Sequence, residues 1–308
     1  MEGFLAATVV AAMPLLFATL GEVITEKSGL LNLGVEGLML IGAVMGFAAG
    51  YGTGNPLIAL GGAIIAGGAG SFIFAFLTVT LRANQVVTGL TLTIFGTGFA
   101  SFMGKSYVGM VVPQGIKDVF VKLHLPLLGD IPFIGPIFFR QDVFVYLGYA
   151  LVILTTIYFY RTKWGLNLKA VGENAASADA SGINVMLYKY AHICVGGALC
   201  GLGGAYMSLV MMSVWVENVV AGRGWIAVAL VIFASWNPIK AFIGAFLFGG
   251  LSILGFRLQS MGIHISQYWV DMLPYGATIL IIILSTQKNR KENQPPADLG
   301  VAYFREER

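Results

Sequence analysis

Long apolar runs, each long enough to cross a lipid bilayer, recur along almost the whole chain. A helix of about 20 apolar residues spans a hydrocarbon core of about 30 Å, and in lipid only helices and closed barrels satisfy every backbone hydrogen bond. Charged residues make up 11% of the chain, against roughly 25% in a soluble domain. We therefore predict an all-α polytopic membrane protein. About nine transmembrane helices are expected, near residues 4–21, 34–50, 56–81, 85–104, 142–160, 190–212, 223–236, 240–257 and 268–286.

Basic residues predict how these spans are oriented. The one long polar insert, residues 161–190, carries four basic and two acidic residues, and the positive-inside rule places it in the cytoplasm. An odd number of crossings then puts Met1 outside. Loop 105–141 is external, and it is long enough to hide a re-entrant segment, so the number of crossings is open by one. We expect a permease domain over 1–287 and a disordered cytoplasmic tail over 288–308, to which we assign no role.

A short helix is predicted within the insert, between Gly172 and Gly182. Asn174 suits the N-terminal cap, four alanines favour helix, and Gly182 suits the C-terminal stop. About two or three turns would form. A helix with so smooth a face buries little core of its own but lets another protein approach closely. The spacing alone leaves two readings open, a docking helix and an ordinary loop with one helical turn.

Four sequence blocks resemble one family of permeases. The run AVGENAASADASGIN at 170–184 is similar to the cytoplasmic coupling loop of permeases in bacterial ABC importers of the simple-sugar, nucleoside and branched-chain amino-acid type. GEVITEKSGLLNLGVEGLMLIGA at 21–43 resembles the signature of the nucleoside branch, and residues 81–98 and 221–250 also look like this family. The blocks follow the order of the family. They are specific for the family and less so for the substrate.

The resemblance implies a division of labour between subunits. A separate cytoplasmic ABC ATPase would use the ATP and receive the helix around residues 173–182, so this chain would bind no cofactor itself. It would pair with a second permease subunit, either a paralogue or another copy, and receive substrate from an extracytoplasmic binding protein or lipoprotein at the bacterial plasma membrane. The residues implied at the contact with the ATPase are Gly172, Glu173, Asn174, Ala175, Ala176, Ala180 and Gly182.

Polar residues inside apolar spans are costly, so each is a candidate for function. Asn32 and Glu36 would share one face if their segment is helical. The alternative for Glu36 is a structural role, bonded to neighbouring backbone or capping a broken helix at its N-terminus. The predicted substrate pathway consists of Asn32, Glu36, Asn84, Gln85 and Thr88, with Asn218, Arg223 and Trp225 near the external mouth.

Two segments repeat each other. NPLIALGGAIIAGG at 55–68 and NPIKAFIGAFLFGG at 237–250 share Asn-Pro, Ala, Gly-Ala and Gly-Gly at the same offsets. The predicted topology puts the copies on opposite faces, as in an inverted repeat whose pathway lies at the repeat interface. Chance similarity between glycine-rich helices is the alternative. Glycines at the G-x-x-x-G spacing, as in Gly197 and Gly201, permit close helix packing in lipid.

Other function classes fit the sequence less well. No catalytic constellation or metal-ligand cluster has a recognisable spacing, and Gly104-Lys105-Ser106 lacks the preceding glycine of a phosphate-binding loop, so we expect no enzyme. The net charge of +3 lies in loops and tail and indicates no nucleic-acid partner. An ion-coupled secondary transporter would need an intramembrane acid or base relay, which is poorly represented. Nucleosides are the favoured substrate, and simple sugars or riboflavin stay open.

Overall fold

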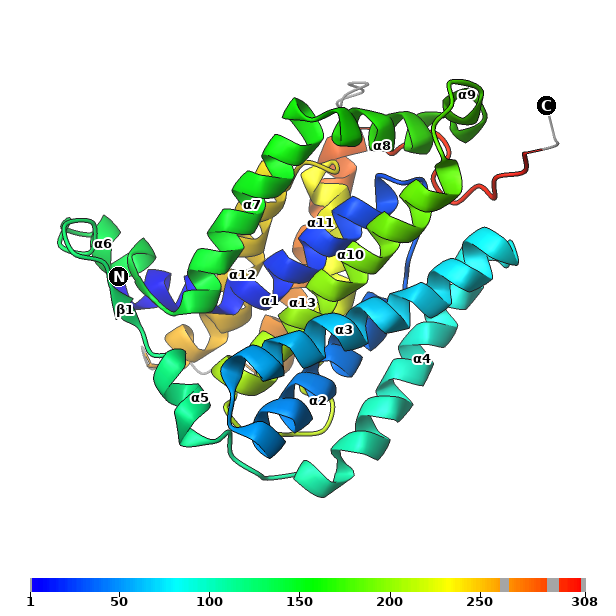
Figure 1. Ribbon diagram of the computed structural model, residues 1–308. Coiled ribbons are helices and arrows are strands. Elements are labelled where there is room, and N and C mark those ends of the chain that lie inside the picture. Colours follow the sequence, from blue (N-terminus) through cyan, green and yellow to red (C-terminus); the bar gives the residue numbers. More distant parts are fainter. Residues whose placement is uncertain (1, 261–265, 287–293, 306–308) are drawn as a thin grey trace.

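The protein is described from a computed structural model that covers residues 2–260, 266–286 and 294–305 (Figure 1). Most of the described residues are helical, and strands are limited to one two-residue pair. Its elements are α1 (Glu2–Glu26), α2 (Val35–Thr53), α3 (Pro56–Ala75), the π-helix η1 (Phe76–Thr80), α4 (Gln85–Gly104), the 3-10 helix η2 (Lys105–Tyr107), α5 (Gln114–Val119), β1 (Leu123–His124), α6 (Ile134–Phe138), β2 (Arg140–Gln141), α7 (Val143–Arg161), α8 (Lys163–Glu173), α9 (Ala175–Ala180), α10 (Val185–Tyr206), the π-helix η3 (Met207–Met211), α11 (Arg223–Ala234), α12 (Pro238–Ser260) and α13 (Gln267–Thr286).

Each of the nine apolar segments expected from the sequence is a helix. Within the described residues, seven helices are long and apolar enough to cross a membrane: α1, α2, α3 with η1, α4 with η2, α7, α10 with η3, and α12. α13 coincides with the last expected segment. α11 has only 12 residues, and at 1.5 Å per residue it covers roughly 18 Å, too little for a full crossing. The chain is a multi-pass membrane protein.

The two sides of the bundle differ in what they carry. α8, α9 and residues 294–305 lie together on one side, which we call the α9 face, while α5, α6 and the N-terminus lie on the other (Figure 1). Loop 105–141 forms only short elements and a two-residue hairpin, with Leu123 paired to Gln141 and His124 to Arg140. α4 ends and α7 begins on this same side, so the loop adds no further crossing, and its longest helix, α5, has only six residues.

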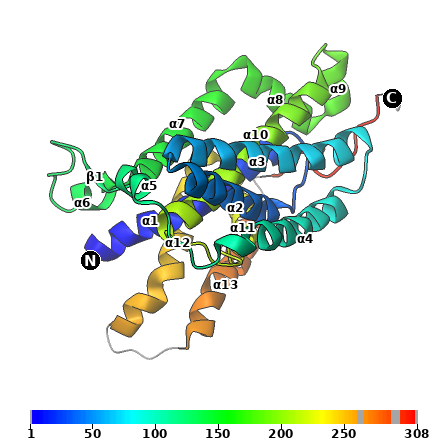
Figure 2. The same cartoon turned by 60° about the horizontal axis from the view of Figure 1, so that its bottom comes forward.

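α10 lies at the centre of the bundle, against α1, α2 and α3 (Figure 2). Glycines make this packing close. A Cβ atom added at Gly201 would meet backbone of α3, and one at Gly204 would overlap the Met39 carbonyl of α2. In lipid, where apolar surface alone gives little drive for helices to associate, small residues that let backbones approach supply the contact. The G-x-x-x-G pair Gly197 and Gly201 thus packs as predicted.

Two crossings are interrupted rather than continuous. After α1, residues 27–34 run back from the α9 face without forming a helix, and α2 begins level with the second or third turn of α4, since Gly37 packs on Leu92 and Thr93. After η3, residues 212–222 enter from the opposite side before α11 starts. Backbone hydrogen bonds fasten this second entry to the loop after α4, from Gly109 N to Trp215 O and from Trp215 N to Met110 O, both 3.0 Å.

These interrupted crossings belong to the repeat seen in the sequence. Asn55 caps α3, its Oδ1 accepting from Leu57 N at 2.9 Å, and Asn237 Oδ1 accepts from Ile239 N of α12, also at 2.9 Å. α3 starts on the side opposite α9 and α12 starts on the α9 face, so the two copies run in opposite directions. α2 precedes one copy and the shorter α11 precedes the other. This is the arrangement expected of an inverted repeat.

Candidate coupling site and membrane junction

The polar insert folds into two helices on the α9 face. α8 begins at a cap made by Thr162, whose Oγ1 accepts from Gly165 N at 3.0 Å. α9 begins at Asn174, whose Oδ1 accepts from Ser177 N at 2.8 Å, and ends before Gly182, which has φ of +82°. Both predicted caps of α9 are therefore present. The helix has six residues, fewer than the two or three turns expected, and α8 was not anticipated.

α9 has an inner and an outer side. Ala175 and Ala178 are buried with Val171 of α8 and Val185 of α10 in a small apolar cluster. The outer side exposes Glu173, Asn174, Ala176, Ala180 and Gly182. Of the seven residues predicted at the contact with the ATPase, Gly172 and Ala175 are buried and face inward. The remaining five are exposed, and Ala176, Ala180 and Gly182 among them present small or absent side chains.

Gly172 instead joins α8 to the turn after α1. A Cβ atom there would overlap the carbonyl of Lys27 and approach Gly29 N. The pKa of Lys27 is lowered, first by its burial and then by the nearby charge of Lys169, while Glu173 acts in the opposite direction. The backbone of α8 at Gly172 is therefore in direct contact with residues 27 and 29, at the start of the interrupted crossing 27–34.

The C-terminal segment fastens α9 further. Asp298 places Oδ2 at 2.7 Å from Ala175 N, at the N-terminus of α9, and its own N–H donates to Gly172 O at 3.0 Å. Gly300 N donates to Gly29 O at 3.2 Å, and Arg305 Nε donates to Asp179 Oδ2 at 3.1 Å. Residues 294–305 thus differ from the disordered tail that composition predicts. Composition measures hydrophobicity, whereas this segment is fastened by polar contacts to backbone.

A second polar site lies where the interrupted crossings meet, inside the bundle. Glu36, in the first turn of α2, accepts from Gly222 N through Oε1 at 2.8 Å and from Gly224 N through Oε2 at 2.6 Å. These N–H groups belong to the start of α11, where a negative charge is favoured. Glu36 is 6% exposed. The structural alternative for Glu36, a cap on a broken helix, is therefore what the structure contains. We call this contact the α2–α11 junction.

Asn32 shapes the entry to α2 rather than sharing its face. Its Oδ1 accepts from Gly34 N at 2.9 Å, and its N–H donates to Glu22 Oε1 at 3.1 Å. α2 begins only at Val35, so Asn32 lies outside the helix and the condition for a face shared with Glu36 is not met. The side chain of Asn32 forms a local turn, which is a common reason for asparagine at a helix entry.

The start of α4 supports the same segment from the other side. Gln85 Oε1 accepts from Leu31 N at 2.7 Å, and Thr93 Oγ1 donates to Leu33 O at 2.9 Å. Asn84 caps α4 through Val87 N at 3.0 Å, and Thr88 Oγ1 donates to the Asn84 carbonyl at 2.8 Å. Of the residues predicted to line a passage, Gln85 thus satisfies a backbone group of the irregular segment 27–34, whereas Asn84 and Thr88 bond the backbone at the start of α4.

The other three predicted pathway residues lie on the second interrupted crossing. Asn218 is exposed in the loop before α11, with φ of +52°. Arg223 Nη1 donates to Val220 O at 3.2 Å, and Trp225, in the first turn of α11, is 37% exposed. Arg223 and Trp225 thus flank Gly224, whose N–H donates to Glu36 at the junction.

Three buried residues escaped the sequence reasoning. Trp236 Nε1 donates to Glu26 Oε2 at 2.5 Å, joining the end of α11 to the end of α1. Glu22, one turn earlier in α1, is fully buried and accepts from Asn32 N. The available signal was the pair of acids four residues apart within an apolar run, which would place them on one helix face.

Comparisons with known proteins agree with this architecture. Residues 4–283 match the family described as branched-chain amino acid transport system, permease component. The chain is 42% identical to a putative glucose ABC transporter permease protein of Haloferax volcanii, over 85% of this chain and 79% of the relative. It is 34% identical to a guanosine ABC transporter permease protein of Bacillus subtilis (98% and 96% covered) and 33% identical to a nucleoside ABC transporter permease protein of Lactococcus lactis (95% and 93%).

The chain belongs to this family of transport-system permeases. The match covers nearly the whole membrane bundle, including the polar insert and both interrupted crossings. It also agrees with the resemblance seen in the sequence blocks.

Proposed function

We propose that the chain is the membrane permease of an ATP-driven importer and that a separate ATPase docks on the exposed side of α9. The observation that carries this proposal is the exposed small-residue surface of α9, because its inner side is fastened to the membrane bundle. Force applied at α9 would pass through Gly172 to Lys27, and from there along 27–34 to α2 and the junction. Because packed elements slide in small steps, such a shift can change which side of the bundle is open.

Under this proposal the α9 face is cytoplasmic. The basic residues of the turn after α1, of the η1–α4 loop and of the polar insert all lie there, as the positive-inside rule requires. The exposed apolar sides of α4 and α7 would face lipid or a second permease subunit, a paralogue or another copy of the chain. An extracytoplasmic binding protein would deliver substrate to the opposite side.

We propose nucleosides as the substrate. Two relatives that match almost the full length are named for guanosine and for nucleosides. Sugars are the second candidate, because the relative with 42% identity is named for glucose. Polar groups around the junction and the exposed Trp225 would offer hydrogen bonds and a stacking face to either ligand.

Substitution at Ala176 tests the coupling role. Ala176→Arg places a long charged side chain on the exposed side of α9, so we expect uptake to fall at least tenfold while the amount of protein in the membrane is unchanged. Gln114→Arg adds the same side chain on α5, on the opposite side, and should leave uptake intact. The measurements are uptake of labelled guanosine in cells and ATP hydrolysis by the purified complex. Normal uptake by Ala176→Arg overturns the coupling assignment.

A panel of labelled solutes tests the substrate. A strain lacking the chain would be compared with a complemented strain for uptake of guanosine, uridine, glucose and riboflavin. Restored uptake of the nucleosides alone supports the proposal. Restored uptake of glucose alone would assign the chain to the sugar branch without affecting the coupling role.

A further inference from the structure

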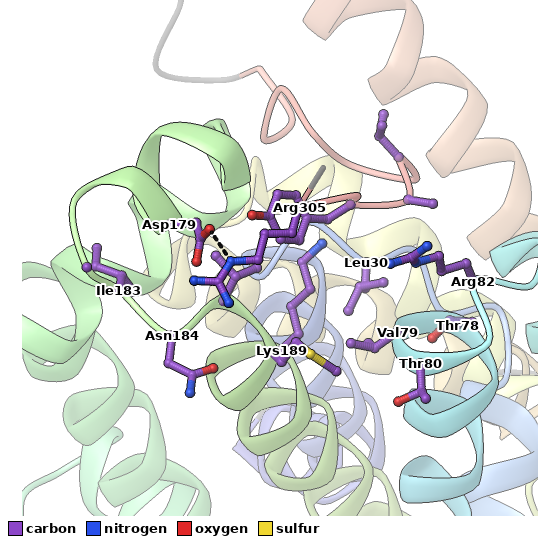
Figure 3. A pocket seen from close by; sticks show the side chains of 16 residues that line it. Leu30, Thr78, Val79, Thr80, Arg82, Asp179, Ile183, Asn184, Lys189 and Arg305 are labelled. Carbon is purple, nitrogen blue, oxygen red and sulfur yellow. Dashed lines mark hydrogen bonds and ion pairs between the residues drawn. The ribbon is translucent and has the colours of Figure 1, made fainter. Parts of the chain in front are cut away.

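A cavity of about 390 Å³ opens on the α9 face and borders the proposed docking surface, with which it shares Gly182. Its walls come from η1, the loop between α9 and α10, and the C-terminal segment (Figure 3). The lining contains three cationic side chains, Arg82, Lys189 and Arg305, and one acidic one, Asp179. Asp179 is already paired with Arg305. The cavity therefore has an excess of positive charge.

Lys189 is the most informative of these groups. Its side chain rises from α10 into the cavity, between Arg305 and Arg82 (Figure 3). The residue is only 2% exposed, and among the described residues it makes no ion pair. An ammonium group removed from water without a counter-charge is strongly unfavourable. The charge of Asp298 acts on this side chain without forming an ion pair with it among the described residues, so its positive charge is only partly balanced.

The backbone adds to the same field. α10 has 22 residues, begins at Val185 and is capped by Asn184, and these two residues, with Met186, line the cavity. The first N–H groups of a helix have no carbonyl partner within it, and they attract anions. Arg82 completes the arrangement from the end of η1, its guanidinium 4.4 Å from the ring centre of Phe304. Donors therefore converge on the cavity from three separate elements.

We propose that this cavity binds a phosphate group. Donors that approach from several directions match the tetrahedral oxygens of phosphate better than a flat carboxylate, and arginine and lysine are the usual phosphate partners. Beside the cavity, Met186 and Leu187 are 48% and 63% exposed and Phe76 is 45% exposed, which marks the level of the membrane. Basic pockets between membrane helices on the cytoplasmic side bind anionic lipid headgroups. A soluble phosphate ester has the same chemistry.

Binding there would add a link between elements that already pack together, α3 and α10 above all. The phosphate would bridge the end of α3 with η1, the start of α10 and the segment that fastens α9. The site does not depend on the substrate of the chain. It would set how firmly α9 is fixed to the bundle.

The test uses the full chain, purified with its partner subunits. In one arm, protein from vesicles of phosphatidylcholine with or without phosphatidylglycerol is analysed by native mass spectrometry for retained lipid. In the other, thermal unfolding is compared in inorganic phosphate and in chloride at equal ionic strength. Lys189→Met and the double variant Arg82→Gln with Arg305→Gln remove the cavity charges. Lys163→Gln removes a cation of α8 outside the cavity and is the control.

We expect each cavity variant to lose retained phosphatidylglycerol, or the phosphate-dependent rise in unfolding temperature, by roughly tenfold in apparent affinity, as when a charge-assisted hydrogen bond is removed. The control should behave like wild type. A loss in the first arm assigns a lipid headgroup, and a loss in the second a soluble phosphate. If Lys189→Met fails to reach the membrane, the double variant, whose two side chains are exposed, decides.

Two results would overturn the proposal. One is equal response of wild type, cavity variants and control in both arms. The other is weaker binding of the ATPase by the cavity variants while lipid retention and the effect of phosphate stay as in wild type. The anion would then be a carboxylate of the partner protein.

Discussion

α10 and α4 are alike in sequence terms and opposite in their surroundings. With the short turns that follow them, they have 27 and 23 residues. The most apolar 18 residues of each have mean hydropathies of 1.7 and 1.5. Of those residues, 78% are buried inside the protein in α10 and 28% in α4. Both start at a capping asparagine. Hydropathy therefore reports that a segment enters the membrane and does not report whether lipid or protein surrounds it.

Glycine position is what separates the two helices. The glycines of α10 face α1, α2 and α3, with neighbours that leave no room for a Cβ atom. In α4, Gly89 packs against the entry to α2 and Gly96 against its first turn. A Cβ atom added at Gly98 would have no neighbour within 4 Å. A central helix thus carries small residues on several sides, and a peripheral one on a single stripe. In lipid this pattern replaces the apolar stripe that identifies the core side of a soluble helix.

Replacing a central glycine should have the largest effect. Gly204→Val puts a branched side chain against the Met39 carbonyl, and because neither α10 nor α2 can move without disturbing other close contacts, we expect a loss of stability of about 3 kcal/mol or more. The measurement is the amount of protein in the membrane together with thermal unfolding of the purified complex.

Gly98→Val on α4 is the matched control. No atom lies within 4 Å of a Cβ added there, so expression and unfolding temperature should stay close to wild type. Equal damage by both variants would contradict the view that packing, and not the loss of glycine itself, separates α10 from α4.

A smaller effect is expected where α4 makes its polar contact. Gln85→Leu removes the acceptor for Leu31 N, which lies at membrane depth beside a buried side chain, and an unpaired buried N–H costs about 2 kcal/mol. Thr91→Val is the control, since Thr91 Oγ1 bonds only Val87 O of its own helix and is exposed. Thermal unfolding of the two variants should differ clearly. An unchanged unfolding temperature for Gln85→Leu would mean that α4 attaches through apolar contacts alone.

The sequence predicts much of this architecture because helix limits depend on local chemistry. Asn55 followed by Pro56, and Asn84 followed by Gln85, mark helix starts through side-chain caps. The same logic located α9 between Asn174 and Gly182. Such caps involve residues two or three apart, so a single sequence contains the whole signal.

The parts that sequence reasoning missed depend on distant contacts. The span expected over 223–236 ends early, because Ser235 and Trp236 adopt positive φ values of 50° and 55° and α11 stops at Ala234, which no pattern of hydropathy reveals. Glu36 acts on residues 186 and 188 positions away. The α9 contact of Asp298 spans 123 positions. Pairings at such separations are decided by the tertiary fold.

The smallest expected effect concerns what the two helices share. Asn84→Ala and Asn184→Ala each remove one cap, from Val87 N in α4 and from Leu187 N in α10, both at 3.0 Å and both at exposed residues. Because a cap acts on the first turn only, we expect each variant to lose about 1 kcal/mol. Aspartate at either position keeps an acceptor oxygen and should restore the unfolding temperature. A loss several times larger at Asn184 than at Asn84 would mean that the start of α10 is also stabilised by contacts with other helices. Central and peripheral helices would then differ at their ends as well as along their sides.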